Sequence, residues 1–141
     1  RRASRRPAPT AVPAALIRRF HEGKLANAPT VTVWGTGKPR REFLCSDDLA
    51  DACVFLMKHY SDLPFLNVGT GEDVTIAEFA SAVARVVGYN GKIAFDTARP
   101  DGPPQKLLDV SKLGALGWKA TIPLAEGIAM TYRDYQEGRR R

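Results

Sequence analysis

The stretch from residue 31 to residue 48, VTVWGTGKPRREFLCSDD, constrains the fold of this chain more than any other. Its pattern is typical of a β-branched strand, a glycine turn, a second extended segment and the start of a helix. A tryptophan, Trp34, and two arginines flank the turn. Tryptophan offers a flat apolar face, and arginine offers a forked donor that matches phosphate oxygens. The stretch therefore predicts either a site for a planar ring and a phosphate or a surface hairpin with a solvated, charged tip.

The two arginines of this stretch, Arg40 and Arg41, are expected to point to opposite faces because side chains alternate along a strand. We therefore expect only one of them to face a site. Ser46 is predicted to cap the helix that follows, with Asp47 and Asp48 in its first turn. The helix dipole favours negative charge there, so we interpret the two aspartates as structural rather than as a metal-binding or acid–base pair.

Helical and strand patterns alternate along the rest of the chain. Thr75 and Glu78 have capping-box spacing and predict a helix start, whereas Gly23 predicts the end of the first helix. The Gly-Thr-Gly at 69–71 lacks the spacing of a phosphate loop, and the nearby Asp73 would repel an anion, so we interpret it as a structural turn. The alternation predicts an α/β fold with helices over 12–21, 46–58, 76–87 and from near 121–123, a short helix from 111, and strands at 31–34, 65–68, 92–95 and 107–109.

A loop with three prolines, DTARPDGPPQK, runs from residue 96 to residue 106. Proline fixes φ and lowers the entropy lost on ordering, so such a loop can hold Arg99, Asp101 and Lys106 in fixed positions. The alternative is a connector whose charges are solvated. The residues alone leave both interpretations open.

The formal charge of +6 belongs to the ends of the chain. Seven of the 21 basic residues lie within 1–6 and 139–141, and the remainder has 14 basic and 15 acidic residues. Ends this rich in Arg and Pro cannot bury enough apolar surface to fold, so we expect tails and no nucleic-acid partner. The expected organisation is a disordered or aberrant basic tail over 1–11, one α/β domain over 12–137 and a second basic tail over 138–141.

Other features exclude further classes of protein. No apolar run approaches the roughly 18 residues that cross a bilayer, and the start lacks the apolar core of a secretory signal. The two cysteines, Cys45 and Cys53, form no CxxC pair and indicate a reducing compartment. Neither histidine, His21 nor His59, has a partner at ligand spacing. We therefore expect a cytoplasmic chain with no membrane partner and no metal site.

Five blocks of the chain carry a resemblance to a known family. From about residue 12 to residue 135 the chain resembles the C-terminal, substrate-binding part of the GDP-L-fucose synthases, within the extended short-chain dehydrogenase/reductases. Many sugar-nucleotide epimerases share a loose form of the second block, whereas PDGPPQKLLD followed by LGW favours the fucose synthases. The blocks are VPAALIRRFHE, APTVTVWGTGKPRREFL with SDDLADA, LNVGTGEDVTI, VVGYNGKIAFD and RPDGPPQKLLDVSKLGALGW.

The resemblance implies a two-domain, NADP-dependent enzyme that epimerises C3 and C5 of GDP-4-keto-6-deoxy-D-mannose and then reduces its 4-keto group by hydride transfer. It implies a small mixed α/β portion that grips the GDP-sugar and, in the whole enzyme, a homodimer. On this interpretation Arg41 and Lys106 neutralise a diphosphate, and Trp34 packs against a ring. Asp101 accepts from hydroxyl or amino groups. The family's substrate-binding positions fall here on Arg19, Trp34, Arg41, Asp101 and Lys106.

Parts of the family's pattern are missing from the chain. It has no GxxGxxG-type turn after an N-terminal strand and no Tyr-x-x-x-Lys pair, and Thr10 stands where the family carries a functional histidine. We therefore expect that the N-terminal Rossmann domain is absent, that this chain alone carries neither NADP nor the catalytic residues, and that it does not catalyse the reaction by itself. Two alternatives stay open: the substrate domain of another epimerase or dehydratase that takes a UDP- or dTDP-sugar, and a free-standing binding module with basic tails.

Overall fold

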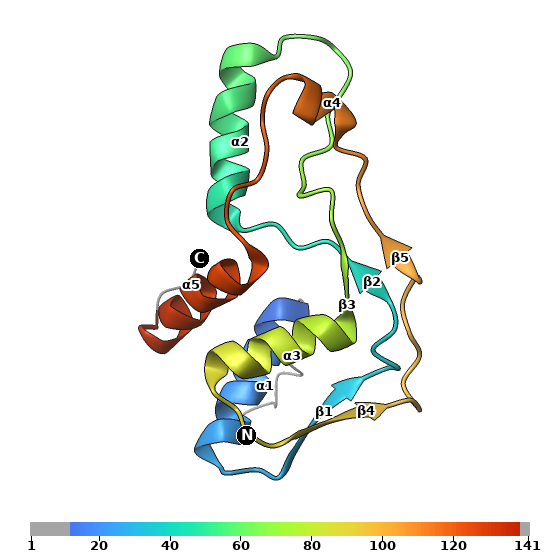
Figure 1. Ribbon diagram of the computed structural model, residues 1–141, viewed down its shortest axis with the longest axis vertical. Helices are drawn as coiled ribbons and strands as arrows, with labels where there is room; N and C mark the ends of the chain where they lie inside the picture. Colours follow the sequence, from blue (N-terminus) through green and yellow to red (C-terminus); the bar gives the residue numbers. More distant parts are fainter. Residues whose placement is uncertain (1–11, 139–141) are drawn as a thin grey trace, which may run out of the picture.

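The computed structural model describes residues 12–138 and confirms the α/β class (Figure 1). Helices and short strands alternate along the chain, as the sequence predicts. The segments 1–11 and 139–141, which hold most of the predicted tails, lie outside the described residues. The elements are α1 (Val12–Leu25), β1 (Thr30–Trp34), β2 (Arg40–Arg41), α2 (Ser46–His59), β3 (Val74–Thr75), α3 (Ile76–Val87), β4 (Lys92–Asp96), β5 (Gln105–Lys106), α4 (Ser111–Ala115) and α5 (Leu124–Gln136).

Two predicted helix boundaries are wrong. The first helix does not end at Gly23 but continues to Leu25. Gly23 is buried against β1, where a Cβ would come within 2.7 Å of Val31 Cγ2, so this glycine permits close packing rather than a turn. Ser46 is the first residue of α2 and not its cap, since Cys45 takes the N-cap position and no side chain caps the helix.

Two predicted strands are also misplaced. The segment 65–68 is irregular, and Phe65 is 90% exposed rather than buried. The strand expected at 107–109 lies two residues earlier, as β5, because the residues that pair with β2 are Gln105 and Lys106. An apolar run is therefore not sufficient to locate a strand, because the strand forms only where the backbone pairs with a neighbour.

Two small sheets position the loops that matter for function. In the first, β1 and β4 run parallel in a register that pairs Thr30 with Lys92 and Trp34 with Asp96. In the second, β2 lies in the centre, antiparallel to β3 and parallel to β5. The loops that follow β1 and β4 leave the same edge of the first sheet, because parallel strands end on the same side.

The main core lies between the first sheet and the helices α1, α3 and α5, which gather in one part of the molecule (Figure 1). Helix α3 packs against both α1 and α5. Phe79, Val83 and Val87 recur at helical spacing on its inner face and are almost fully buried. Full burial of one such side chain contributes about 1.5–3 kcal/mol, so the inner face of α3 is an important source of apolar stabilisation.

A smaller core joins α2 to α4, and Figure 1 shows this pair standing apart from the other helices. It contains Ala52, Leu113 and Trp118, and the Trp118 indole donates to Asp51 Oδ2 at 2.8 Å. Asp48 is buried and accepts from the backbone amides of residues 121 and 122. The structural interpretation of this aspartate is confirmed, although its main partners are the segment before α5 and not the helix dipole alone.

The predicted capping box is present at the start of α3. Glu78 N donates to Thr75 Oγ1 at 3.0 Å, and Thr75 N donates to Glu78 Oε2 at 2.7 Å.

We predict that Thr75→Ala lowers the free energy of unfolding by about 1 kcal/mol, because one helix amide loses its acceptor. Urea unfolding measures the change. Ser81→Ala, on the exposed side of the same helix, is the control and leaves stability nearly unchanged; equal losses in both variants would contradict a capping role.

Candidate functional site

A pocket of about 460 Å³ opens between α1, the turn after β1, β2 and the loop after β4. We call it the arginine pocket, because Arg18, Arg19 and Arg41 all contribute to its wall. Its floor is apolar and includes Leu16 and Ile76. A mostly apolar cleft with a few converging charged groups is the usual form of a small-molecule site. The full lining is Val12, Ala14, Ala15, Leu16, Arg18, Arg19, Val33, Trp34, Gly37, Pro39, Arg41, Ile76, Pro100, Asp101 and Gly102.

Four of the five predicted site residues meet in this pocket. Arg19 comes from α1, Trp34 from the end of β1, Arg41 from β2 and Asp101 from the loop after β4. The fifth, Lys106, does not line it. Lys106 is exposed on β5, where its Cα pairs with that of Arg41.

Arg41 joins β2 to the proline-rich loop. Its Nη1 donates to Pro103 O at 2.8 Å and to Arg40 O at 2.6 Å. Gly102 lies so close that a Cβ there would come within 3.0 Å of Arg41 Nη2. The guanidinium therefore has a fixed position at the pocket wall and keeps further N–H donors, since it carries five in all.

Asp101 has a partner within the chain that the sequence did not reveal. Thr36 N donates to Asp101 Oδ1 at 2.9 Å, and Thr36 Oγ1 donates to Oδ2 at 2.7 Å. These bonds, the hydroxyl first, hold the pKa of the Asp101 carboxyl below its ordinary value of 3.8. Asp101 thus ties the loop after β4 to the turn after β1, and acceptance from a ligand, which the resemblance implies, would add to this role.

Trp34 has two arginine partners. The Cζ atoms of Arg19 and Arg99 each lie 4.8 Å from the centroid of its ring. The sequence singled out Arg99 only as a charge presented by the loop, and no local spacing connects it to Trp34. The contact exists because β1 and β4 pair in parallel and bring residue 34 beside residue 96.

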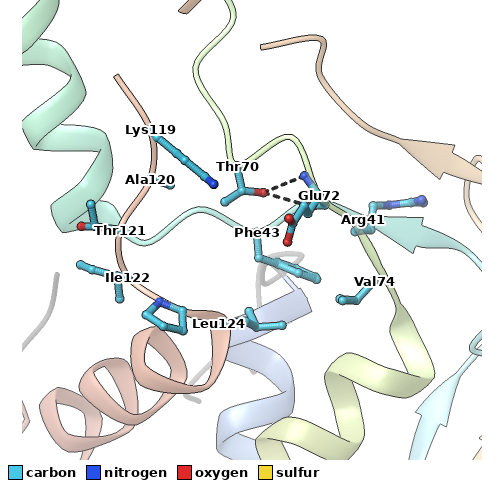
Figure 2. A pocket seen from close by; sticks show the side chains of 11 residues that line it. Arg41, Phe43, Thr70, Glu72, Val74, Lys119, Ala120, Thr121, Ile122 and Leu124 are labelled. Carbon is cyan, nitrogen blue, oxygen red and sulfur yellow. Dashed lines mark hydrogen bonds between the residues drawn. The ribbon is translucent and has the colours of Figure 1, made fainter. Parts of the chain in front are cut away.

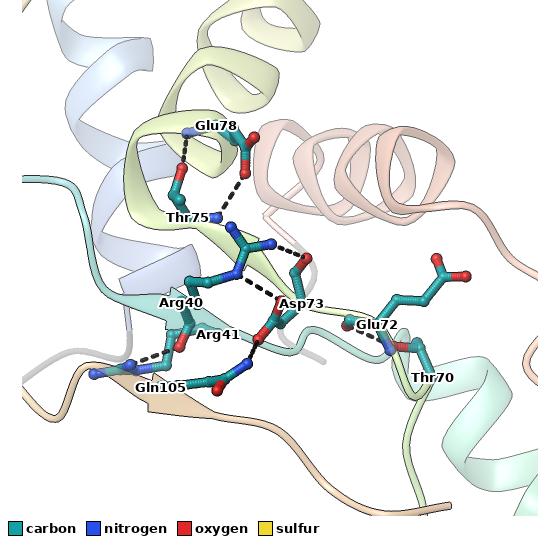
Figure 3. Close-up of polar contacts among 8 residues, drawn as sticks. All are labelled: Arg40, Arg41, Thr70, Glu72, Asp73, Thr75, Glu78 and Gln105. Carbon is teal, nitrogen blue, oxygen red and sulfur yellow. Dashed lines mark hydrogen bonds and ion pairs between the residues drawn. The ribbon is translucent and has the colours of Figure 1, made fainter.

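Arg40, the neighbour of Arg41, has a structural role, as alternation along the strand predicted (Figure 3). Its Nε lies 2.8 Å from Asp73 Oδ1, and Asp73 Oδ2 accepts from Gln105 Nε2 at 2.6 Å. The Gln105 bond first, and then the Arg40 bond, hold the pKa of Asp73 below its ordinary value of 3.8. Asp73 directly precedes β3, and its hydrogen bonds to Arg40 and Gln105 therefore link β2 to β5.

The Gly-Thr-Gly turn at 69–71 is filled from within the chain. Gly71 N donates to Glu42 Oε2 at 2.7 Å, and Leu108 N donates to Glu42 Oε1 at 3.2 Å. The Glu42 carboxylate therefore already accepts the hydrogen bond from the Gly71 amide that the pyrophosphate of a dinucleotide would need. The residues of this turn therefore do not fit NADP, and the interpretation as a structural turn is confirmed.

A second pocket, of about 300 Å³, adjoins the arginine pocket at Arg41 (Figure 2). Phe43 and Leu124 form apolar wall, and the turn at 70–72 faces the segment 119–124 across it. Lys119 and Glu72 bring charges of opposite sign. This pocket is therefore a poorer match to a diphosphate than the arginine pocket, whose charged residues are three arginines and one aspartate.

Residues 12–138 show neither a metal-binding cluster nor a membrane-spanning helix. No three His, Cys, Asp or Glu side chains there gather in a way that could hold a metal ion. No helix in the same range is both long and apolar enough to span a bilayer. The arginine pocket is thus the candidate site that the described residues support best.

Comparison with known proteins shows which family the chain resembles. Residues 2–69 match the model of the NAD dependent epimerase/dehydratase family. The chain is 58% identical over 123 residues to a probable GDP-L-fucose synthase 1 of Oryza sativa subsp. japonica, covering 87% of this chain and 38% of the relative. It is 48% identical over 136 residues to a GDP-L-fucose synthase of Escherichia coli (strain K12), covering 90% and 42%.

A solved structure also resembles the chain. The GDP-mannoheptose C4 reductase of Campylobacter jejuni, solved with NADP bound, superimposes with a TM-score of 0.79 at 40% identity. The match covers 90% of this chain and 45% of the reductase. The chain therefore spans about two-fifths of the length of the relatives it matches.

The Arg40–Asp73–Gln105 crosslink predicts a pH dependence of stability. Because the pKa of Asp73 is lowered in the folded state, its contribution is complete above the ordinary aspartate range and is lost as the pH falls through the lower, folded value. We predict that Asp73→Asn unfolds more easily than the wild type at neutral pH, and that the difference shrinks on acidification below pH 3.8. Denaturant unfolding across pH measures this. Asp62→Asn, in an exposed loop, is the control, and a gap that grows on acidification would contradict the crosslink.

Proposed function

Because the chain belongs to the NAD dependent epimerase/dehydratase family, within the extended short-chain dehydrogenase/reductases, we propose that it forms the nucleotide-sugar-binding part of a GDP-L-fucose synthase. The observation that carries the proposal is the arginine pocket. Arg19, Trp34, Arg41 and Asp101 come from four separate segments and meet at one cleft. Guanidinium groups bind phosphate oxygens in forked pairs, so a nucleoside diphosphate is the ligand class that fits.

The roles proposed for individual residues follow from their positions. Arg41 binds the diphosphate from the pocket wall, and Lys106 adds positive charge from the adjacent strand β5. Arg19 approaches from α1, where its Nη1 donates to Thr32 O at 3.1 Å. Asp101 keeps the loop after β4 against the turn after β1 and accepts from a hydroxyl or amino group of the ligand.

The base assigned to the ligand is guanine. The relatives named above are a probable and an assigned GDP-L-fucose synthase, and the related reductase from Campylobacter jejuni is named for a GDP-sugar. The loop that holds Asp101 carries the run PDGPPQKLLD, on which the resemblance to the fucose synthases rests. A UDP- or dTDP-sugar is the competing ligand, and the titration below distinguishes the two.

The proposed reaction of the whole enzyme is epimerisation at C3 and C5 of GDP-4-keto-6-deoxy-D-mannose, followed by reduction of its 4-keto group. NADPH supplies the hydride when it is bound to another part of that enzyme. The residues of this chain bind and orient the diphosphate, and no proton or hydride transfer is assigned to them. A cytoplasmic location and a homodimer of the whole enzyme, both expected from the sequence, belong to the same proposal.

An exposed apolar face supports a proposal for where the rest of the enzyme docks. One side of α2 packs on α4, whereas Leu49, Val54 and Met57 of the same helix are exposed. The segment after α2 adds Leu63 and Phe65, which is 90% exposed. We propose that this α2 face packs against an N-terminal nucleotide-binding domain, because the relatives are more than twice as long as the segment they share with this chain.

We predict that the chain binds GDP, with preference over UDP, and that Arg41→Lys weakens GDP binding roughly tenfold because lysine cannot form the forked pair. Isothermal titration calorimetry measures both affinities. Arg85→Ala, on the exposed side of α3 and outside the pocket, is the control and leaves the affinity unchanged. A clear preference for UDP would overturn the assignment of guanine, and absence of binding to either nucleotide would overturn the pocket as a nucleotide site.

We also predict that the isolated chain self-associates through the α2 face at micromolar concentration. The double variant Met57→Lys/Phe65→Lys reduces this association and stays folded, because both side chains are exposed and contribute little to the core. Light scattering coupled to size exclusion measures the mass. Leu25→Lys, at the exposed end of α1, is the control. A wild-type chain that stays monomeric would contradict the proposed docking face.

A further inference from the structure

Trp34 is expected from the family resemblance to pack against a ring of the ligand, but in the structure its own ring already has partners. The guanidinium carbons of Arg19 and Arg99 each lie 4.8 Å from its centroid. Arg19 reaches it from α1, and Arg99 reaches it from the loop after β4. A guanidinium at this distance occupies a position that a stacked base would otherwise take.

The two guanidiniums have few competing partners in the part of the chain that the structure describes. Arg19 donates to Thr32 O at 3.1 Å, and Arg99 Nε lies 3.7 Å from Asp96 Oδ2. These contacts use a small share of the five N–H donors that each arginine carries. Both side chains therefore keep donors for an anionic ligand while their flat faces contact the indole.

The loop that carries Arg99 is held against the pocket at two points. Asp101, two residues later, is bonded to Thr36, and Pro103 O accepts from Arg41. Pro100, which directly follows Arg99, lines the arginine pocket. Arg99 therefore directly precedes a residue of the pocket lining, and its contact with Trp34, which also lines the pocket, restricts its side chain.

Resting on the proposed function, we propose that Trp34 is a platform for Arg19 and Arg99, and that Arg99 is a further phosphate-binding residue of the arginine pocket. Trp34 is then a positioning residue that acts through two cations rather than a stacking partner for the base. Arg19 and Arg41 line the pocket and Arg99 shares the Trp34 ring with Arg19, so like charges lie near one another, and the negative face of the indole offsets part of their repulsion. A bound diphosphate removes the rest, so binding is strongest for the ligand with the larger phosphate charge.

The test compares GDP with GMP, because the two nucleotides share a base and differ in phosphate charge. Arg99→Ala should weaken GDP binding roughly tenfold and GMP binding by a smaller factor. Trp34→Leu should show the same pattern, since both cations lose their platform. Arg99→Lys should lie between Arg99→Ala and the wild type, because lysine keeps the charge and loses the planar fork. Arg85→Ala is the matched arginine control on α3.

Base stacking by Trp34 gives the opposite result and would overturn the inference: Trp34→Leu would weaken GDP and GMP by the same factor, and Arg99→Ala would change neither. Arg99 is exposed, so its variants keep the fold and decide the matter if Trp34→Leu is unstable. If the wild type binds GDP and Arg99→Ala binds it with the same affinity, only this inference is overturned. Wild-type chain that binds no GDP overturns the proposed function itself, and the inference with it.

Discussion

The parallel pairing of β1 with β4 is the constraint on which the arginine pocket depends. Its register sets Trp34 opposite Asp96, although sixty-two positions separate them in the sequence. The glycine turn after β1 and the proline-rich loop after β4 therefore leave the sheet at one edge, which is where ligands bind in many α/β proteins. The bonds from Thr36 to Asp101 then join the two loops. A shifted register would separate the residues that the proposed function requires.

The second sheet divides binding from structural roles. Arg40 and Arg41 are neighbours on β2, but Arg40 contacts Asp73 and Arg41 lines the pocket. Glu42 continues the pattern by filling the turn at 69–71 from the same strand region. Three consecutive charged residues thus reach three different partners, and the alternation of a strand is sufficient to separate the first two.

Much of the fold follows from local patterns. The capping box at the start of α3 is predicted by Thr75 and Glu78 and observed with both of its bonds. Gly23 is predicted to end α1 but lies within it, because its role, close contact with Val31, depends on packing between distant segments. The segment around Phe65 differs from its prediction for a related reason: it is apolar like a buried strand, and yet Phe65 is exposed in the structure. Its apolar character is explained if it faces the domain proposed to dock there.

The candidate site could be predicted only in part, because some of its contacts depend on the pairing of distant strands. Resemblance placed Arg19, Trp34, Arg41 and Asp101, and the fold brings these four to one pocket. The partners Thr36 and Arg99 carry no local signal, because their contacts exist only after β1 and β4 pair. Local sequence predicts the capping box of α3 and the turn at 69–71, whereas contacts across a parallel crossover require the tertiary structure.

The chain contains an internal comparison for its central claim, since one tryptophan borders the arginine pocket and the other is buried beside α2. The direct measurement is a titration with GDP followed by the indole N–H signals in a nitrogen-15 correlation spectrum. A nucleotide site in the arginine pocket predicts that the Trp34 indole signal shifts with GDP while the Trp118 signal, whose N–H is bonded to Asp51, stays in place. A shift of Trp118 alone, or of neither indole at saturating GDP, would contradict it.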